Sequence, residues 1–177
     1  MKIKMRFPVV KSVATLLALF ILAGTFLLVA DAAAGSLEFK LKDLKNHSRS
    51  YSELKGNKLT VIDFWATWCK PCGRSIPKLV QLNDKYKEKG VAFIGISIDG
   101  PRNLSKVRPY ARSKKIDFTV LLDVNGDVMG RMNVKVVPTL IIVDGDDEVV
   151  YFHQGYRSGD HKVIEEEIVK LLSGSEE

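Results

Sequence analysis

The sequence contains little cysteine and little histidine. Only two of its 177 residues are cysteine and three are histidine. A closed zinc site usually takes four ligands, and His47, His153 and His161 show no paired ligand spacing. We therefore expect no metal centre. Because each histidine stands alone among polar or strand-end residues, we expect these side chains to be solvated or hydrogen-bonded rather than catalytic.

A large excess of charge is also missing from most of the chain. The net charge is +6, but residues 1–34 hold four basic residues and one acidic residue, so that residues 35–177 carry only +3. A net charge this small does not indicate a basic surface for a nucleic acid, and no nucleic-acid partner is expected. The 143 residues from position 35 onward can build one ordinary hydrophobic core. We expect a single domain there.

The amino terminus carries the long apolar run of the chain. Basic residues within positions 1–11 precede 19 uncharged residues from Ser12 to Ala30. This pattern is typical of an export signal and predicts that residues 1–34 are a signal peptide or a membrane anchor. The length favours an uncleaved anchor, whereas the small residues 32–34 before Gly35 suit cleavage by a signal peptidase. In either case the basic end stays cytoplasmic and the rest of the chain is exported.

The two cysteines stand two residues apart in Trp68-Cys69-Lys70-Pro71-Cys72, behind an apolar run and ahead of a helical pattern. The unpaired N–H groups and the dipole of a helix N-terminus favour an anion, so we expect an exposed Cys69 sulfur with a stabilised thiolate and a lowered pKa. Pro71 suits an early helical position, and Lys70 adds a positive charge. Cys69 is thus the expected nucleophile. Cys72, which lies deeper, is expected to resolve the mixed disulfide.

Three other interpretations compete with a redox-active dithiol. A structural disulfide that closes a ring of about four residues would stabilise the fold by only about 2 kcal/mol. Zinc binding lacks the further ligands that it needs. Chance proximity of two inert thiols does not account for the residues that flank them. The redox-active dithiol therefore explains the segment best.

Strand and helix patterns alternate along the rest of the chain. Apolar runs predict buried strands at residues 59–65, 91–98 and 118–122, a short edge strand at 37–41, and a hairpin formed by 139–143 and 148–153. Helical spacing predicts helices at 71–89, 103–114, 128–132 and 161–172, with one helical turn at 52–54. This alternation predicts an α/β sandwich, and the terminal hairpin makes its sheet mixed.

The segments around the cysteines resemble a known family. Residues 63–72 are similar to the active-site segment of the thioredoxin superfamily, and residues 136–140 resemble its cis-proline segment, with Pro77 at the place of a helix-bending proline. The stretch at about residues 100–133 is similar to the insertion of the TlpA/ResA-like thiol-disulfide oxidoreductases. The resemblance covers roughly residues 36–172. It implies a thioredoxin-like three-layer α/β/α sandwich with a mixed central sheet.

Asp63 interrupts an apolar strand six residues before Cys69. An ionised carboxylate is costly to bury, so burial is expected to raise the pKa of Asp63 and to let it act as the base when Cys72 attacks the mixed disulfide. Thioredoxins, which this segment resembles, also carry an aspartate here. A carboxylate held by a structural hydrogen bond or a water molecule is the alternative.

The resemblance also implies a substrate surface. A cis Val137–Pro138 bond would bring Val137 beside the two sulfurs and expose its backbone to an extended substrate segment. Trp68 is the expected apolar contact for the substrate, against the alternative of a passive cover over the disulfide. Many TlpA/ResA-like proteins carry a glutamate three residues after the second cysteine, where this chain has Ser75. Proton handling is therefore expected to depend on Asp63.

By resemblance, the chain is an enzyme without a bound cofactor, whose redox centre is the Cys69–Cys72 disulfide. The expected reaction is the reduction of disulfides in exported proteins, with apocytochrome c among the candidate clients and a membrane thiol-disulfide carrier as the electron donor. The expected place is the bacterial periplasm or the outer face of the inner membrane, to which the N-terminal segment anchors the chain. A thiol-dependent peroxidase and an assembly factor that traps clients without turnover remain as alternatives.

Overall fold

The computed structural model describes residues 37–174. The predicted signal or anchor segment, residues 1–34, lies outside the described residues and stays a prediction. Among the helices between residues 37 and 174, none combines the length and the apolar character that crossing a bilayer requires.

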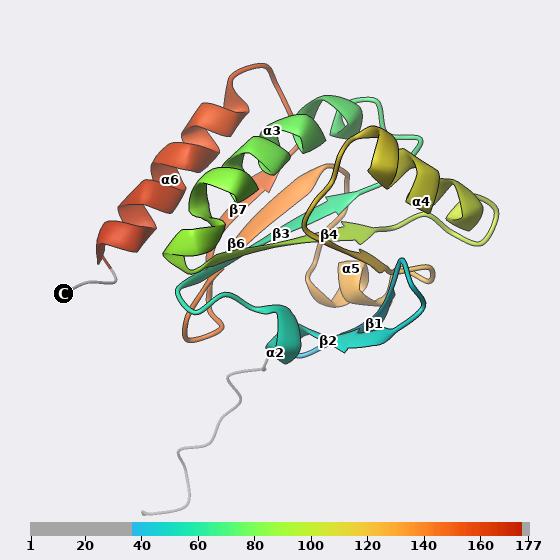
Figure 1. The fold of residues 1–177 in the computed structure, drawn as a ribbon, viewed down its shortest axis with the longest axis horizontal. Helices are drawn as coiled ribbons and strands as arrows, with labels where there is room; N and C mark the ends of the chain where they lie inside the picture. Colours follow the sequence, from blue (N-terminus) through green and yellow to red (C-terminus); the bar gives the residue numbers. More distant parts are fainter. Residues whose placement is uncertain (1–36, 175–177) are drawn as a thin grey trace, which may run out of the picture. The chain divides into compact units, whose positions relative to one another are not determined.

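A seven-stranded sheet forms the centre of the described part, in the order β2-β1-β5-β4-β3-β6-β7 (Figure 1). The strands are β1 (Lys40–Asp43), β2 (Ser48–Ser50), β3 (Leu59–Trp65), β4 (Val91–Ser97), β5 (Thr119–Leu122), β6 (Thr139–Asp144) and β7 (Val149–Gln154). The pairs β3·β4 and β4·β5 are parallel, whereas β6 and β7 form the predicted antiparallel hairpin beside β3. The sheet is therefore mixed, as predicted.

Helices cover both faces of this sheet. They are α2 (Tyr51–Leu54), α3 (Cys72–Tyr86), the short 3-10 helix η1 (Lys87–Lys89), α4 (Leu104–Ser113), α5 (Asp127–Arg131) and α6 (Asp160–Gly174). Helices α3, α4 and α6 lie on one face, and α5 lies on the other (Figure 1). This is the three-layer arrangement that the sequence resemblance implied.

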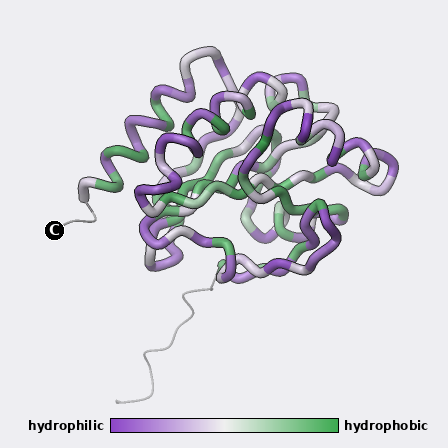
Figure 2. Tube along the Cα trace, viewed as in Figure 1, coloured by the Kyte–Doolittle hydropathy of each residue, from purple (hydrophilic) through white to green (hydrophobic). Residues whose placement is uncertain are grey.

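The alternation of side chains along β3 explains the layers. All seven of its residues are buried, because both faces are covered. Ile62 and Phe64 pack in the core that faces α2 and α5, whereas Val61 and Trp65 belong to the cores that face α3, α4 and α6. The apolar colour in Figure 2 is accordingly concentrated on the central strands. Side chains two residues apart in a strand point to the same face. The side chain of Asp63 therefore lies on the same face of β3 as those of Val61 and Trp65, which is the face that α3 covers.

The predicted elements differ from the observed ones mainly at the start of the described part. The predicted edge strand 37–41 is displaced to β1, and a second strand, β2, was not predicted. The Ser-Arg-Ser sequence of β2 has no apolar alternation, and antiparallel pairing with β1 makes it a strand. The predicted helix 71–89 ends earlier, at Tyr86, and continues as η1 up to Gly90, which has a positive φ of 85°. The stretch at residues 100–133 contains α4, β5 and α5.

Candidate active site

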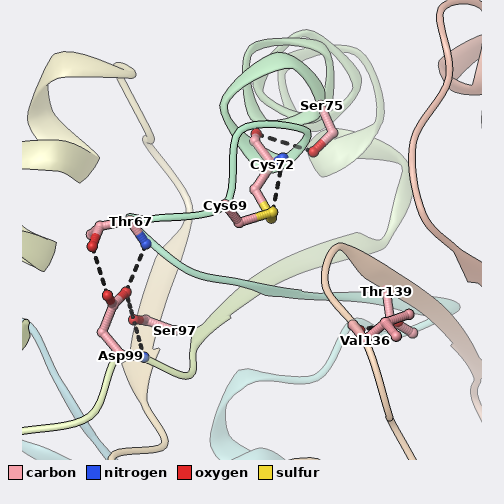
Figure 3. Close-up of a disulfide and its surroundings, with 8 residues drawn as sticks. All are labelled: Thr67, Cys69, Cys72, Ser75, Ser97, Asp99, Val136 and Thr139. Atoms are coloured by element: carbon pink, nitrogen blue, oxygen red, sulfur yellow. Dashed lines mark hydrogen bonds between the residues drawn. A yellow bond between two sulfur atoms is a disulfide. The ribbon is translucent and has the colours of Figure 1, made fainter.

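The two cysteines lie where β3 leads into α3. Helix α3 begins at Cys72, and Pro71 immediately before it already has helical φ and ψ of −60° and −38°. Cys69 and Cys72 form a disulfide with an S–S distance of 2.05 Å and a Cα–Cα distance of 5.3 Å (Figure 3). The predicted pairing of the two cysteines is therefore confirmed.

The backbone at the start of α3 is directed at the first sulfur. The N–H of Cys72 donates a hydrogen bond to Sγ of Cys69 at 3.2 Å (Figure 3). A donor at a helix N-terminus stabilises negative charge on the atom that it faces. Cys72, which is fully buried, receives no such donor among the described residues, so the contact supports the predicted role of Cys69 as the nucleophile, which stays a prediction.

The two cysteines are more deeply buried than predicted. Cys69 is only 5% exposed, so the prediction that its sulfur is exposed is wrong, although Cys72, at 0%, does lie deeper. The reason is packing: both cysteines belong to a core cluster with Trp65 and with Val107 of α4. Trp68, next to Cys69, is 58% exposed and forms the apolar surface beside the disulfide. Lys70 is also exposed.

Asp63 is buried in the middle of β3. It is 3% exposed, its neighbours in the sheet are Gly95 and Leu140, and its Oδ2 has no hydrogen-bond partner among the described residues. Burial raises the pKa of Asp63 well above its usual value, because the ionised form loses its hydration. The carboxyl lines a small cavity together with Ser75, which is one helical turn beyond Cys72. A buried carboxyl that holds its proton more tightly than usual can exchange it with a thiol.

The cis-proline segment lies against the same cluster. The Val137–Pro138 bond is cis, as the resemblance implied, and the Val137 side chain packs on the cluster that contains both cysteines. Thr139 Oγ1 donates a hydrogen bond to the carbonyl of Val136 at 2.7 Å, which holds the turn before β6 (Figure 3). Val136 is 49% exposed. The segment thus carries an exposed apolar side chain next to Val137, the residue that packs on the cysteine cluster.

A carboxylate that the sequence did not single out holds the active-site loop. Asp99, 1% exposed, accepts hydrogen bonds from Thr67 N–H at 2.8 Å, Thr67 Oγ1–H at 2.6 Å and Ser97 Oγ–H at 2.9 Å (Figure 3). These contacts join the end of β4 to the loop just before Cys69. The sequence did hold a signal for Asp99. It is a polar residue directly after a predicted buried strand, and the neighbouring strand ends in the dithiol loop.

Helix α4 supports the site from the side. Tyr110 stacks on Trp65 with 5.5 Å between ring centroids. Gly95 lies close to the indole, since an added Cβ would be 3.0 Å from Trp65 Nε1 and the ring would have to shift. Lys114, which follows α4, donates a hydrogen bond from Nζ to the carbonyl of Gly73 at 3.0 Å. Part of the stretch at residues 100–133 is therefore structural support for the dithiol helix.

A neutral side chain follows the dithiol by one helical turn. Ser75, which takes the place of the glutamate of many TlpA/ResA-like proteins, donates its hydroxyl to the carbonyl of Cys72 at 3.1 Å and is buried. Within residues 37–174, no three His, Cys, Asp or Glu side chains are grouped as metal ligands.

The sequence matches known proteins over most of its length. Residues 31–152 match the AhpC/TSA family. The chain is 33% identical to the thiol-disulfide oxidoreductase ResA of Geobacillus kaustophilus over 63% of its residues, and 32% identical to ResA of Bacillus cereus over 77%. These matches span 63% of the Geobacillus protein, just under two thirds of its length, and 71% of the Bacillus protein.

The fold is also that of solved structures. A protein from Chlorobium tepidum described as a thiol:disulfide interchange protein of the DsbE type superposes with a TM-score of 0.70 at 29% identity, over 76% of this chain and 93% of that one. A thioredoxin-like protein from Porphyromonas gingivalis gives a TM-score of 0.64 at 35% identity, over 76% of this chain and 89% of that one. Family match, relatives and fold agree with the resemblance drawn from the sequence, and the chain belongs to the AhpC/TSA family, among its thioredoxin-like thiol-disulfide oxidoreductases.

Proposed function

We propose that the chain reduces disulfides in extracytoplasmic cysteine-containing proteins. The observation that carries this proposal is the Cys69–Cys72 disulfide at the start of α3, with the Cys72 N–H donated to Sγ of Cys69 at 3.2 Å. The ResA relatives support the class of chemistry. The export pattern of residues 1–34 supports the compartment, with the segment serving as a signal peptide or a membrane anchor.

The reaction is a two-electron exchange in two steps. The Cys69 thiolate attacks one sulfur of the client disulfide, that S–S bond breaks, and the other client sulfur leaves as a thiolate that takes up a proton. Asp63 then accepts the proton of the Cys72 thiol, and the Cys72 thiolate attacks Sγ of Cys69. The second client sulfur leaves and is protonated. The client is reduced, the Cys69–Cys72 pair is oxidised, and a membrane thiol-disulfide carrier returns the two electrons.

The client is held beside the dithiol by two apolar side chains and by backbone. Trp68 and Val136 are both large, apolar and about half exposed. The Val137 backbone, next to the cis bond, provides pairing for an extended segment of the client. An unfolded or extended cysteine segment suits this surface better than a rigid folded one, and an apocytochrome of the c type before haem attachment is one such client.

A peroxidase is the less favoured function. The chain has only two cysteines, and both are in the disulfide, which leaves no separate peroxidatic cysteine. A client trap has the same surface as the reductase but stops at the mixed disulfide. Turnover therefore separates the trap from the enzyme.

The test uses the full chain in detergent, equilibrated with graded thiol and disulfide buffers, to measure the reduction potential of the Cys69–Cys72 pair. A value near about −250 mV or below supports a reductant, and a value near about −120 mV identifies an oxidant that introduces disulfides. In a second assay, a peptide disulfide is supplied with excess reductant, and the Cys69→Ser variant serves as the control. Reduction that stops near one equivalent identifies a trap, and a pair that never cycles overturns the enzyme.

A further inference from the structure

A small cavity separates Asp63 from the start of α6. Its walls come from β3, α3, β6, β7 and α6, and its polar side chains are Asp63, Ser75, Lys78, His153, Tyr156 and His161. The space in which the centre of a water molecule fits is about 10 Å³. A single water needs about that much room. The cavity is therefore matched in size to one water molecule.

Two buried polar atoms border this cavity without a partner among the described residues. They are Oδ2 of Asp63 and Nδ1 of His161, and both residues line the cavity. Leaving a buried acceptor unpaired costs about 1–3 kcal/mol, so a shared partner stabilises both. Both atoms are acceptors when Asp63 is ionised and His161 carries its proton on Nε2. One water molecule has two O–H donors, which is the number that two such acceptors need.

The other polar groups around the cavity already have partners or are neutral. On α3, Lys78 Nζ donates to Gln81 Oε1 at 3.5 Å. On β7, His153 Nε2 lies 3.1 Å from Asp160 Oδ2, and Asp160 also accepts the Arg157 N–H at 2.6 Å.

Burial raises the pKa of Tyr156, which keeps its phenol protonated at neutral pH. Outside the cavity wall, Glu165 of α6 accepts hydrogen bonds from Lys85 and Tyr86 of α3. Cys72 begins α3, one helical turn before Ser75 of the cavity wall. Of these groups, His161 is the one whose unpaired acceptor borders the cavity with Asp63.

We propose that His161 is a positioning residue for the proton chemistry of Asp63, and that the two side chains share one water molecule in this cavity. The proposal rests on the proposed function, in which Asp63 takes the proton of the Cys72 thiol. That proton then passes from the Asp63 carboxyl to the water, while the water gives one of its own to Nδ1 of His161. Nε2 of His161 releases a proton to solvent, so that each resolving step moves one proton from the Cys72 thiol to solvent and leaves Asp63, the water and His161 unchanged. The path therefore ends at His161 on α6.

The pH dependence of turnover tests this path. Asp63 acts as a base in its ionised form, so the rate of the resolving step rises with pH through its pKa. His161→Phe puts an apolar ring in the cavity, which deepens the desolvation of Asp63 and moves the rising limb to higher pH. At pH 7 the rate should fall by up to about tenfold, the equivalent of one lost hydrogen bond of about 1.4 kcal/mol. His161→Gln, whose side-chain oxygen still accepts, should lie between this variant and the unmodified chain.

The matched control is His47→Gln, because His47 is an exposed histidine near β1 whose Nδ1 lies 3.5 Å from Asp43 Oδ2. It should leave the pH profile unchanged. Circular dichroism and thermal melting confirm that each variant is folded before its rates are compared.

A double-variant cycle shows whether His161 acts through Asp63. In an Asp63→Asn background, His161→Phe should have no further effect on the single-turnover rate of the full chain with a peptide disulfide. The water path alone is overturned if His161→Phe slows the reaction equally in the unmodified and the Asp63→Asn backgrounds. It is also overturned if Asp63→Asn is slow but His161→Phe leaves the pH profile unshifted. Unmodified turnover in Asp63→Asn overturns the role of Asp63 and the path with it. A dithiol that does not cycle overturns the proposed function instead.

Discussion

The backbone N–H of Cys72 donates a hydrogen bond to Sγ of Cys69 across 3.2 Å. This relationship makes the two cysteines unequal, because one sulfur receives a donor and the other is completely buried. In the reduced chain, Cys69 should therefore react with iodoacetamide at pH 7 at least about tenfold faster than Cys72, which corresponds to one charge-assisted hydrogen bond. Single-cysteine variants, Cys72→Ser and Cys69→Ser, measure the two rates separately. Equal rates would contradict the assignment of Cys69 as the nucleophile.

Asp63→Asn should make the fold more stable while it slows catalysis. Burial raises the pKa of Asp63 in the folded chain. The contribution of Asp63 to the free energy of unfolding is therefore complete below its pKa in the unfolded chain, about 3.9, and is lost as pH rises through its pKa in the folded chain. At pH 8 the variant should gain about 1 kcal/mol or more in the free energy of unfolding, and this gain should shrink towards pH 4. Urea unfolding at the two pH values measures it. Asp146→Asn, on the exposed turn between β6 and β7, is the control and should show no such pH-dependent gain.

Asp99→Ala should loosen the loop that carries the nucleophile. Three donors from Thr67 and Ser97 lose their shared acceptor in a buried place, and the expected loss of unfolding free energy is about 3 kcal/mol. Thr67→Val removes only the hydroxyl bond and should cost about 1 kcal/mol. The attack of Cys69 on a small disulfide should slow in the same order. Losses of equal size in the two variants would show that the backbone N–H of Thr67 does not depend on Asp99.

Trp68→Ala should affect client binding more than stability. The indole is 58% exposed, so the free energy of unfolding should change by less than about 0.5 kcal/mol. The KM for a peptide disulfide should rise, while the rate with a small disulfide that does not reach the Trp68 surface stays the same. Val163→Ala, an exposed apolar position on α6, is the matched control. If the KM does not move, the indole is a passive cover.

Tyr110 should matter through its ring and not its hydroxyl. The ring stacks on Trp65, so Tyr110→Ala should cost about 2 kcal/mol and change the tryptophan fluorescence, whereas Tyr110→Phe keeps the stack. The rate of Cys69 attack should fall only in the alanine variant. Chemical unfolding followed by fluorescence measures both effects. Similar losses in the two variants would assign the effect to the phenol.

Much of the fold was predictable because its strongest patterns are local. The apolar run of β3 and the helical spacing of α3 and α6 depend on residues close together in the chain, and the structure has these elements within a few residues of their predicted bounds. Strand β2 was missed because its three residues carry no apolar pattern and become a strand only through pairing with β1. The dithiol and the cis bond were recognised through segments of contiguous residues.

The rest of the site depends on residues that are far apart in sequence. Asp99 is 32 residues from Thr67, and no pattern in the chain links them. His161 follows Asp63 by nearly a hundred positions, and its isolated place in the sequence predicted a solvated or hydrogen-bonded side chain. In the structure, His161 lines the cavity of Asp63, and its buried Nδ1 has no hydrogen-bond partner among the described residues.

The order of residues was enough to predict the redox chemistry, because two cysteines at this spacing before a helix are a local feature that needs no distant partner. It also established the alternating α/β layers and the buried carboxyl, since an acidic residue within an apolar strand is visible in the chain itself. The tertiary structure decided how deeply Cys69 is covered, which carboxylate holds the dithiol loop, and which side chain shares a cavity with Asp63. Each of these depends on packing between segments, and packing joins residues whose positions along the chain carry no common pattern.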